Sequence, residues 1–267
     1  MQVKDKHQQN ETIDYERRGA LFASAGAALL ALTPVMGNAA ELITPDAPAS
    51  GVAADTHAMD ERVVPIYDEP GHHVVMQNSE MRVMRVMIRP GTSTMWHAQN
   101  LDFVNTIISG SHTVIARKGE GPGKKVEMVT GSVRYGDYQR APIVDQVSNV
   151  GQTLIHQIAF EIIDLANGNY GKADRSQVKN FSIVLDKPRV RGWRLKLAPG
   201  ETTARYRQDG PGIRVVLAGA RLIESRPGEI GQQISLRHGD AMFTTPATLA
   251  ITNADSEPLE LMEYELL

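Results

Sequence analysis

Three polar side chains of this chain have the types and spacing to hold a small ligand or a metal ion. His97 and Gln99 follow the turn dipeptide Pro90-Gly91, and because they are two residues apart, their side chains point to the same face of a strand. Asp145 follows a second turn, Gly136-Asp137. An imidazole and a carboxylate can bind a divalent metal, to which an amide oxygen adds weakly, and the same groups can hydrogen-bond a small polar molecule. Either chemistry requires the fold to bring the three side chains together.

The elements that must position these side chains are predicted to be strands. From His97 to Ile107, alternate residues give one face that mixes polar and apolar groups, which is typical of a barrel interior with a site in it, and Gly110 ends this strand. Apolar patterning predicts further strands at 81–88 and 126–135, and no convincing amphipathic helix interrupts the β pattern after residue 63. The sequence therefore predicts an all-β fold.

The turns and strands occur twice. Pro90-Gly91 and Gly110 recur 109 residues later as Pro199-Gly200 and Gly219, and the strand MRVMRVMIRPG that leads into the first turn matches VRGWRLKLAPG before the second. The later turn, Gly136-Asp137 with Pro142 and Asn149, recurs as Gly239-Asp240 with Pro246 and Asn253. A tandem duplication is the simplest explanation.

The candidate ligand positions change between the repeats. His97, Gln99 and Asp145 correspond to Tyr206, Gln208 and Leu249. The second repeat thus has no histidine at these positions, so a metal site is not expected there, while Tyr206 either closes a pocket or packs.

The spacing of these residues resembles the two sequence motifs of the cupin superfamily. Gly91, His97, Gln99 and Gly110 fall in register with the first motif, and Gly136-Asp137, Pro142, Asp145 and Asn149 with the second. In cupins, three histidines and one glutamate hold a divalent metal, whereas here Gln99 and Asp145 replace two histidines and Phe103 replaces the glutamate. The resemblance implies two tandem cupin barrels, jelly-roll-like double-stranded β-helices, at 64–166 and 167–267.

In that register His97, Gln99 and Asp145 converge inside the first barrel. The metal-free interpretation, in which they bind one another and a small polar ligand, is favoured; the alternative is a degenerate site for iron, manganese, zinc or nickel. His156 shares a strand face with Ile158, Phe160 and Ile162, so it lies either in the pocket, as a substitute ligand, or in the core. Tyr206 and Gln208 are the matching pocket candidates of the second barrel.

The N-terminal residues predict export. Arg17-Arg18 precede an apolar stretch at 20–36, and Gly37, Asn38 and Ala39 resemble a signal-peptidase site, so residues 1–39 are predicted to be a signal peptide. The arginine pair favours the twin-arginine route over the ordinary secretory route, and an uncleaved anchor is the third alternative. Residues 40–63 are rich in Pro, Ala and Asp and read as a linker or flexible arm. We expect a periplasmic or secreted bacterial protein.

The composition of the chain limits the kinds of partner that we expect. The net charge of −3 gives no reason to expect nucleic acid, nor a membrane once the signal is cleaved. The chain has no cysteine, which excludes thiolate metal sites and cysteine nucleophiles. Cupin-like proteins often pair through edge strands, so the resemblance implies a homodimer.

Two functions stay open at this stage. The first is an exported two-barrel protein that binds a small molecule, or serves as a partner module, without catalysis. The second is a metal-dependent enzyme of the dioxygenase, isomerase or decarboxylase type that works from the first barrel. Replacement of the ligand positions in both repeats, with the turns retained, favours the first.

Overall fold

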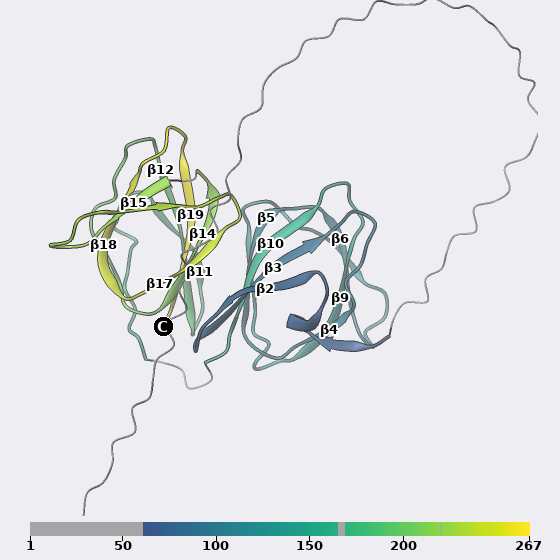
Figure 1. Ribbon diagram of the computed structural model, residues 1–267. Coiled ribbons are helices and arrows are strands. Elements are labelled where there is room, and N and C mark those ends of the chain that lie inside the picture. The colour runs from purple at the N-terminus through teal and green to yellow at the C-terminus, as the bar shows by residue number, and fades with distance from the viewer. Residues whose placement is uncertain (1–60, 165–168, 220) are drawn as a thin grey trace, which may run out of the picture. The chain divides into compact units, whose positions relative to one another are not determined.

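The computed structural model describes residues 61–164, 169–219 and 221–267. Among these residues there are nineteen strands and one short 3-10 helix, η1, at Ile66–Asp68 (Figure 1). The predicted signal peptide and most of the arm lie outside the described residues. Within the part that is described, no helix has the length and apolar character needed to cross a membrane.

The first repeat forms two five-stranded sheets, with strand orders β1-β4-β9-β6-β7 and β2-β3-β10-β5-β8. Their strands are β1 (Val63–Pro65), β2 (His72–Gln77), β3 (Met81–Ile88), β4 (Trp96–Gln99), β5 (Phe103–Ser109), β6 (His112–Arg117), β7 (Lys124–Glu127), β8 (Val133–Gly136), β9 (Ile143–Asn149) and β10 (Ile155–Ile162).

The second repeat forms a five-stranded sheet, β11-β12-β19-β14-β17, and a four-stranded sheet, β13-β18-β15-β16. Its strands are β11 (Phe181–Asp186), β12 (Val190–Leu197), β13 (Tyr206–Gln208), β14 (Gly212–Ala218), β15 (Arg221–Ser225), β16 (Gln232–Ser235), β17 (Ala241–Thr244), β18 (Ala247–Asn253) and β19 (Leu259–Leu266). The predicted all-β architecture of two tandem barrels is confirmed. The predicted boundary at 166/167 falls in the undescribed residues 165–168 and stays a prediction.

Two predicted strands are each divided in the structure. The strand expected from His97 onward ends at Gln99, and β5 begins at Phe103 in the other sheet. The strand expected at 126–135 is split into β7 and β8 by a turn at Gly131, whose φ of 77° favours glycine. The alternation survives the break, because His97, Gln99 and Phe103 all face the interior.

The duplication holds at the level of single hydrogen bonds. The side-chain amide of Asn149 donates to the carbonyls of Ile88 and Thr153, and that of Asn253 donates to those of Leu197 and Glu257. Each asparagine thus ties the end of its β9 or β18 strand to two other segments in the same way. The predicted correspondence of these two residues is confirmed.

The expected match between Gly136-Asp137 and Gly239-Asp240 is wrong. The Gly239 amide donates to Val216 as the Gly131 amide donates to Ile107, so Gly131 is the counterpart of Gly239. The strand β8 ends at Gly136, and the six residues 137–142 separate it from β9. In the second repeat, only residues 245–246 separate the corresponding strands β17 and β18. The first repeat therefore carries a longer loop at this point.

Strand alternation assigns the two faces of β10. Ile155 and Ala159 point into the first barrel and pack with Ile107, whereas Ile158 and Phe160 point away from it. The outward face belongs to a core cluster that also contains residues of the second repeat, such as Tyr264, whose hydroxyl lies 2.7 Å from that of Thr106. The two barrels thus share an apolar core through their outer sheet faces.

Candidate functional site

A cavity of about 320 Å³ lies inside the first barrel, between its two sheets. Apolar side chains such as Val86, Ile88 and Phe103 form part of its wall. Its interior polar lining consists of His72, His97, Gln99, Asn105, Asp145 and Gln157. Convergent polar groups beside apolar side chains in one cavity are typical of a small-ligand site, and here the polar groups are numerous.

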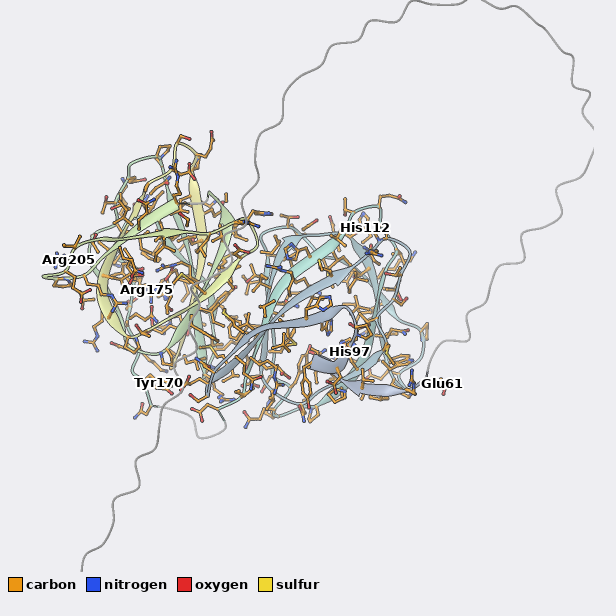
Figure 2. All side chains as sticks on the ribbon, viewed as in Figure 1. Glu61, His97, His112, Tyr170, Arg175 and Arg205 are labelled. Atoms are coloured by element: carbon orange, nitrogen blue, oxygen red, sulfur yellow. The ribbon has the colours of Figure 1, made fainter. Side chains whose placement is uncertain are left out.

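The three residues singled out by the sequence meet in this cavity. His97 and Gln99 on β4 lie beside Asp145 on the paired strand β9. His97 Nε2 is 3.1 Å from Asp145 Oδ1, and Gln99 Nε2 donates to the same oxygen over 2.9 Å. All three side chains are buried, and Figure 2 labels His97 among the strands of its barrel.

The second ring nitrogen of His97 is also occupied. His97 Nδ1 lies 3.0 Å from the carbonyl oxygen of Met95, which can only accept. Burial disfavours the imidazolium, but the hydrogen bond to Asp145 and the charge of that carboxylate outweigh burial and raise the pKa of His97. The geometry therefore favours a charged His97 paired with an ionised Asp145.

His72 is a further cavity residue, and it is not among the candidates that the sequence indicated. Its ring lies perpendicular to that of His97 with 4.9 Å between centroids, and its Nδ1 is 2.9 Å from the carbonyl oxygen of Ile66. Burial and the charge of His97 lower the pKa of His72 to about 4, so its ring is neutral at pH 7. The repeat indicates this position. Phe181 lies 109 residues after His72, and its ring contacts that of Tyr206 edge to face, with 4.8 Å between the centroids.

Two amide side chains form another part of the wall. Asn105 Nδ2 donates to Gln157 Oε1 over 2.9 Å, and Gln157 Nε2 lies 3.2 Å from Met128 Sδ. Asn105 Oδ1 and Gln99 Oε1 are buried without a hydrogen-bond partner. Two unsatisfied acceptors in one cavity are costly unless a bound group donates to them.

Tyr138 covers part of the cavity from the longer loop at 137–142. Its ring centroid is 6.5 Å from that of Phe103, and burial followed by the charge of Asp145 raises the pKa of its hydroxyl. A Cβ on Gly136 would lie 2.2 Å from the Tyr138 ring, so only glycine allows the ring to fold back there. Arg117 and Arg134 also line the cavity.

His156 does not belong to this site. It lies on the outward face of β10, near Arg85 and Asp240, and a Cβ on Gly239 would be 2.6 Å from its ring. The prediction chose the apolar face of β10 as the interior, but that face is apolar because it packs in the core shared with the second barrel. The inward position next to it is Gln157.

Tyr206 and Gln208 lie inside the second barrel, in packed surroundings. Tyr206 contacts Phe181 and lies under the Arg175 guanidinium, 4.7 Å from the ring centroid. Burial raises the pKa of its hydroxyl. Gln208 Nε2 donates to Gly210 and Thr244. Neither residue lines the cavity of the first barrel.

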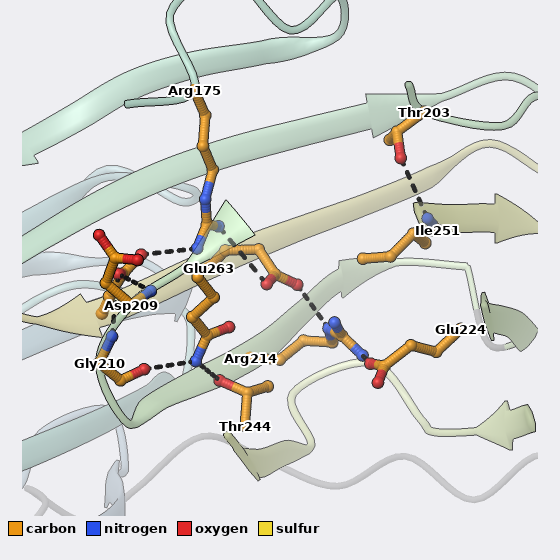
Figure 3. A network of polar contacts seen from close by, with 11 residues as sticks. Arg175, Thr203, Asp209, Gly210, Arg214, Glu224, Thr244, Ile251 and Glu263 are labelled. Atoms are coloured by element: carbon orange, nitrogen blue, oxygen red, sulfur yellow. Dashed lines mark hydrogen bonds and ion pairs between the residues drawn. The ribbon is translucent and has the colours of Figure 1, made fainter. Parts of the chain in front are cut away.

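A buried ionic network fills the second barrel (Figure 3). Arg214 Nε donates to Glu263 over 2.5 Å, and Arg214 reaches Glu224 over 3.2 Å. Arg175, which precedes β11, donates to Glu265 over 2.8 Å. Both arginines, Glu263 and Glu265 are almost entirely shielded from solvent, and Glu224 is buried.

The network occupies positions that leave space in the first barrel. Strand pairing and the repeat register align Arg214 with Asn105 and Glu263 with Ala159, so two long charged side chains replace a short amide and a methyl group. One barrel therefore keeps an open interior and the other fills its own.

The donors of the first barrel do not fit a metal ion in this arrangement. His97 Nε2 directs its hydrogen toward Asp145 Oδ1 and would have to break that contact to become a ligand, and Gln99 offers only its weak amide oxygen. Across 61–164, 169–219 and 221–267, no three His, Cys, Asp or Glu side chains group closely enough to hold an ion.

These features define the chain as a protein of the cupin fold with two barrels, of which the first has an accessible interior. It is similar to the oxalate decarboxylase of Lactobacillus farciminis solved with formate, with 10% identity, 75% of this chain and 84% of that chain covered, and a TM-score of 0.51. It is also similar to the Escherichia coli protein Ylba, with 11% identity, 74% and 85% covered and a TM-score of 0.52. The 11S globulin of Wrightia tinctoria, described as having an auxin binding site, gives 10% identity, 70% and 75% covered and a TM-score of 0.51.

No family model and no curated protein matches the sequence. At these identities the structural likeness shows the fold alone, which hosts enzymes and binding proteins alike.

Proposed function

We propose that this protein binds a small polar molecule in the cavity of its first barrel. The observation that carries the proposal is the difference between two barrels of one duplicated chain. The second barrel fills its interior with the ion-paired side chains of Arg214 and Glu263, whereas the first keeps an open cavity in which Gln99 Oε1 and Asn105 Oδ1 have no hydrogen-bond partner.

The chemistry of the cavity favours binding over reaction. Asp145 is held by His97 and Gln99 together, so its carboxylate orients two neighbours rather than standing free as a base. The cavity volume of about 320 Å³ is at the lower end of the roughly 300–1,000 Å³ common for ligand pockets. A compact ligand with hydrogen-bond donors suits this space.

A ligand-observed NMR screen tests the proposal. Purified protein without its first 60 residues is mixed with a library of small polar compounds, and hits are titrated by calorimetry against wild type and Gln99→Leu. We expect saturable binding at one site per chain, weakened in the variant, which loses an acceptor in the cavity. Hits that bind both proteins equally, or no hits at all, would remove the support for a site here.

The metal-dependent alternative has its own measurement. Elemental mass spectrometry of protein purified without chelator, beside His97→Ala and Asp145→Ala, reports any iron, manganese, zinc or nickel. Near-stoichiometric metal that both substitutions abolish would replace the binding proposal by an enzyme one, acting from the first barrel.

Export and assembly are part of the proposal. We propose a periplasmic or secreted location through residues 1–39 and a homodimer as the assembly. Replacing Arg17-Arg18 by two lysines should retain the protein in the cytoplasm if the twin-arginine route is used, and sedimentation gives the subunit number.

A further inference from the structure

We infer that the ligand of the first barrel carries an anionic oxygen group, bound by Arg134 and Arg117, together with hydroxyl or amino hydrogens that Gln99 and Asn105 accept. This inference rests on the proposed binding function and names the chemical class of its ligand.

Arg134 places a guanidinium on the cavity wall, with no counter-ion among the described residues. It lies on β8 directly opposite Asn105 on β5, so the two side chains share the inward face of the sheet. Arg134 is half-buried and lines the cavity. Among the residues that the structure describes, it has no hydrogen bond and no ion pair. A guanidinium presents a planar fork of donors that matches a carboxylate or phosphate.

Arg117 adds a second cation on the same cavity. It lies on β6 opposite Asp145 on β9 and also lines the cavity. Its one ion pair in the described part of the chain is to Glu120, at 3.9 Å, where both side chains are about half-exposed or more. Such a pair contributes little, so Arg117 can turn to a ligand at small cost.

The charges of the cavity favour an anion. The carboxylate of Asp145 is paired with His97, whose Nε2 is 3.1 Å away. Arg117 and Arg134 remain, and both act on the hydroxyl of Tyr138 in the covering loop. A cavity lined by one guanidinium without an ion pair and a second that is only weakly paired attracts an oxyanion.

In the second repeat, the positions that correspond to Arg134 and Arg117 carry no unpaired charge. The position of Arg134 is taken by Met242, which lies opposite Arg214. The position of Arg117 is taken by Arg226, which donates to Glu224 over 3.0 and 3.1 Å. The unpaired Arg134 and the weakly paired Arg117 thus occur in the barrel that has the cavity.

The two acceptors without hydrogen-bond partners determine which groups the rest of the ligand must carry. Gln99 Oε1 and Asn105 Oδ1 can only accept, so they require hydroxyl or amino hydrogens. A hydroxycarboxylate, an amino acid or a phosphate monoester of a polyol has both features. The same molecule with an amide in place of the acid keeps its donors and loses the charge.

The test compares acids with their neutral analogues. Lactate, malate and 3-hydroxybenzoate are titrated beside lactamide, malamide and 3-hydroxybenzamide, with glycerol 3-phosphate and glycerol as the phosphate arm, by calorimetry at pH 7. The proteins are wild type, Arg134→Gln, Arg117→Gln and the charge-matched control Arg205→Gln on the second repeat. The thermal unfolding of each variant verifies that it is folded.

We expect an acid to bind wild type and its neutral analogue to bind more weakly by about tenfold or more, with a similar loss in Arg134→Gln and none in Arg205→Gln. Carboxylate and phosphate are distinguished by which arm binds. Equal binding of acids and neutral analogues, with no effect of Arg134→Gln, would overturn the inference and leave the binding function standing. Absence of binding by these probes and by the whole small-molecule screen would overturn both.

Discussion

His97 and its neighbours show how single residues set the chemistry of the first barrel. Asp145 accepts from both His97 and Gln99, which fixes the three side chains and favours a charged imidazole. His72, which contacts the His97 ring, is kept neutral by burial and by that charge. The two contacting histidine rings therefore have pKa values shifted in opposite directions.

The neutral state of His72 predicts a specific loss of stability in acid. Its pKa is about 4 in the folded protein and 6.5 ordinarily, so between these values the unfolded chain binds a proton that the folded protein does not. Stability therefore falls as the pH is lowered from 6.5 to 4, by about 3 kcal/mol from this residue. In His72→Phe, which copies Phe181 of the second repeat, this contribution disappears.

Urea unfolding between pH 7 and 4 measures the effect. The difference in unfolding free energy between wild type and His72→Phe should shrink or reverse as the pH falls. The control is His73→Phe, on the exposed neighbour that points to the opposite face. If both variants follow the pH dependence of wild type, His72 is not the buried neutral group described above.

At the scale of elements, the loop between β8 and β9 distinguishes the two repeats. It is four residues longer in the first repeat, and it places Tyr138 over the cavity. The fold-back depends on Gly136, whose missing Cβ makes room for the ring. This loop is the element that we expect to control access to the ligand.

Gly136→Ala should displace Tyr138 and weaken ligand binding. The added methyl group clashes with the ring at 2.2 Å, so the ring must leave its place, at a cost of about 1–3 kcal/mol in stability. Tyr138→Ala should reduce affinity to a similar extent, whereas Tyr138→Phe keeps the ring and should bind nearly as wild type. Calorimetric titration of one ligand from the screen compares the three. Unchanged affinity in Gly136→Ala would show that Tyr138 does not shape the site.

The strands of the second barrel position an ionic network whose members depend on one another. Arg214 bonds Glu263 and Glu224, and all of these groups are buried. Arg214→Met leaves carboxylates without their cation, so we expect a loss of about 3–5 kcal/mol in unfolding free energy. Lys179→Met, which breaks an exposed pair with Glu201, should change the unfolding free energy far less. Similar losses in both variants, measured by urea unfolding, would contradict a structural role of the network.

At the scale of the whole molecule, the duplication was the feature most readable in the sequence. The turns at Pro90-Gly91 and Pro199-Gly200 and the correspondence of Asn149 with Asn253 were sufficient to predict a tandem duplication, and the cupin resemblance added that each repeat is a barrel. The convergence of His97 with Asp145 also followed from the register. These features are local in sequence or repeated, so spacing alone can show them.

Other parts of the site depend on contacts that no spacing reveals. The apolar face of β10 looked like a barrel interior, but Ile158 and Phe160 pack in the core shared by the two barrels, and His156 goes with them. Gly136 looked like the counterpart of Gly239, because the longer loop shifts the register after Gly131. Such errors arise where one repeat meets the other or differs from it in length.

The central claim is that the two barrels differ because one fills its interior with its own side chains. The double variant Asn105→Arg with Ala159→Glu transplants the pair Arg214 and Glu263 into the first barrel at positions that are directly paired on β5 and β10. The most direct test is calorimetric titration of a ligand from the screen into this variant and into wild type, with circular dichroism and thermal unfolding to verify the fold. We predict that the folded variant no longer binds while wild type binds at one site. A folded variant that binds as tightly as wild type would place the ligand elsewhere and contradict the claim.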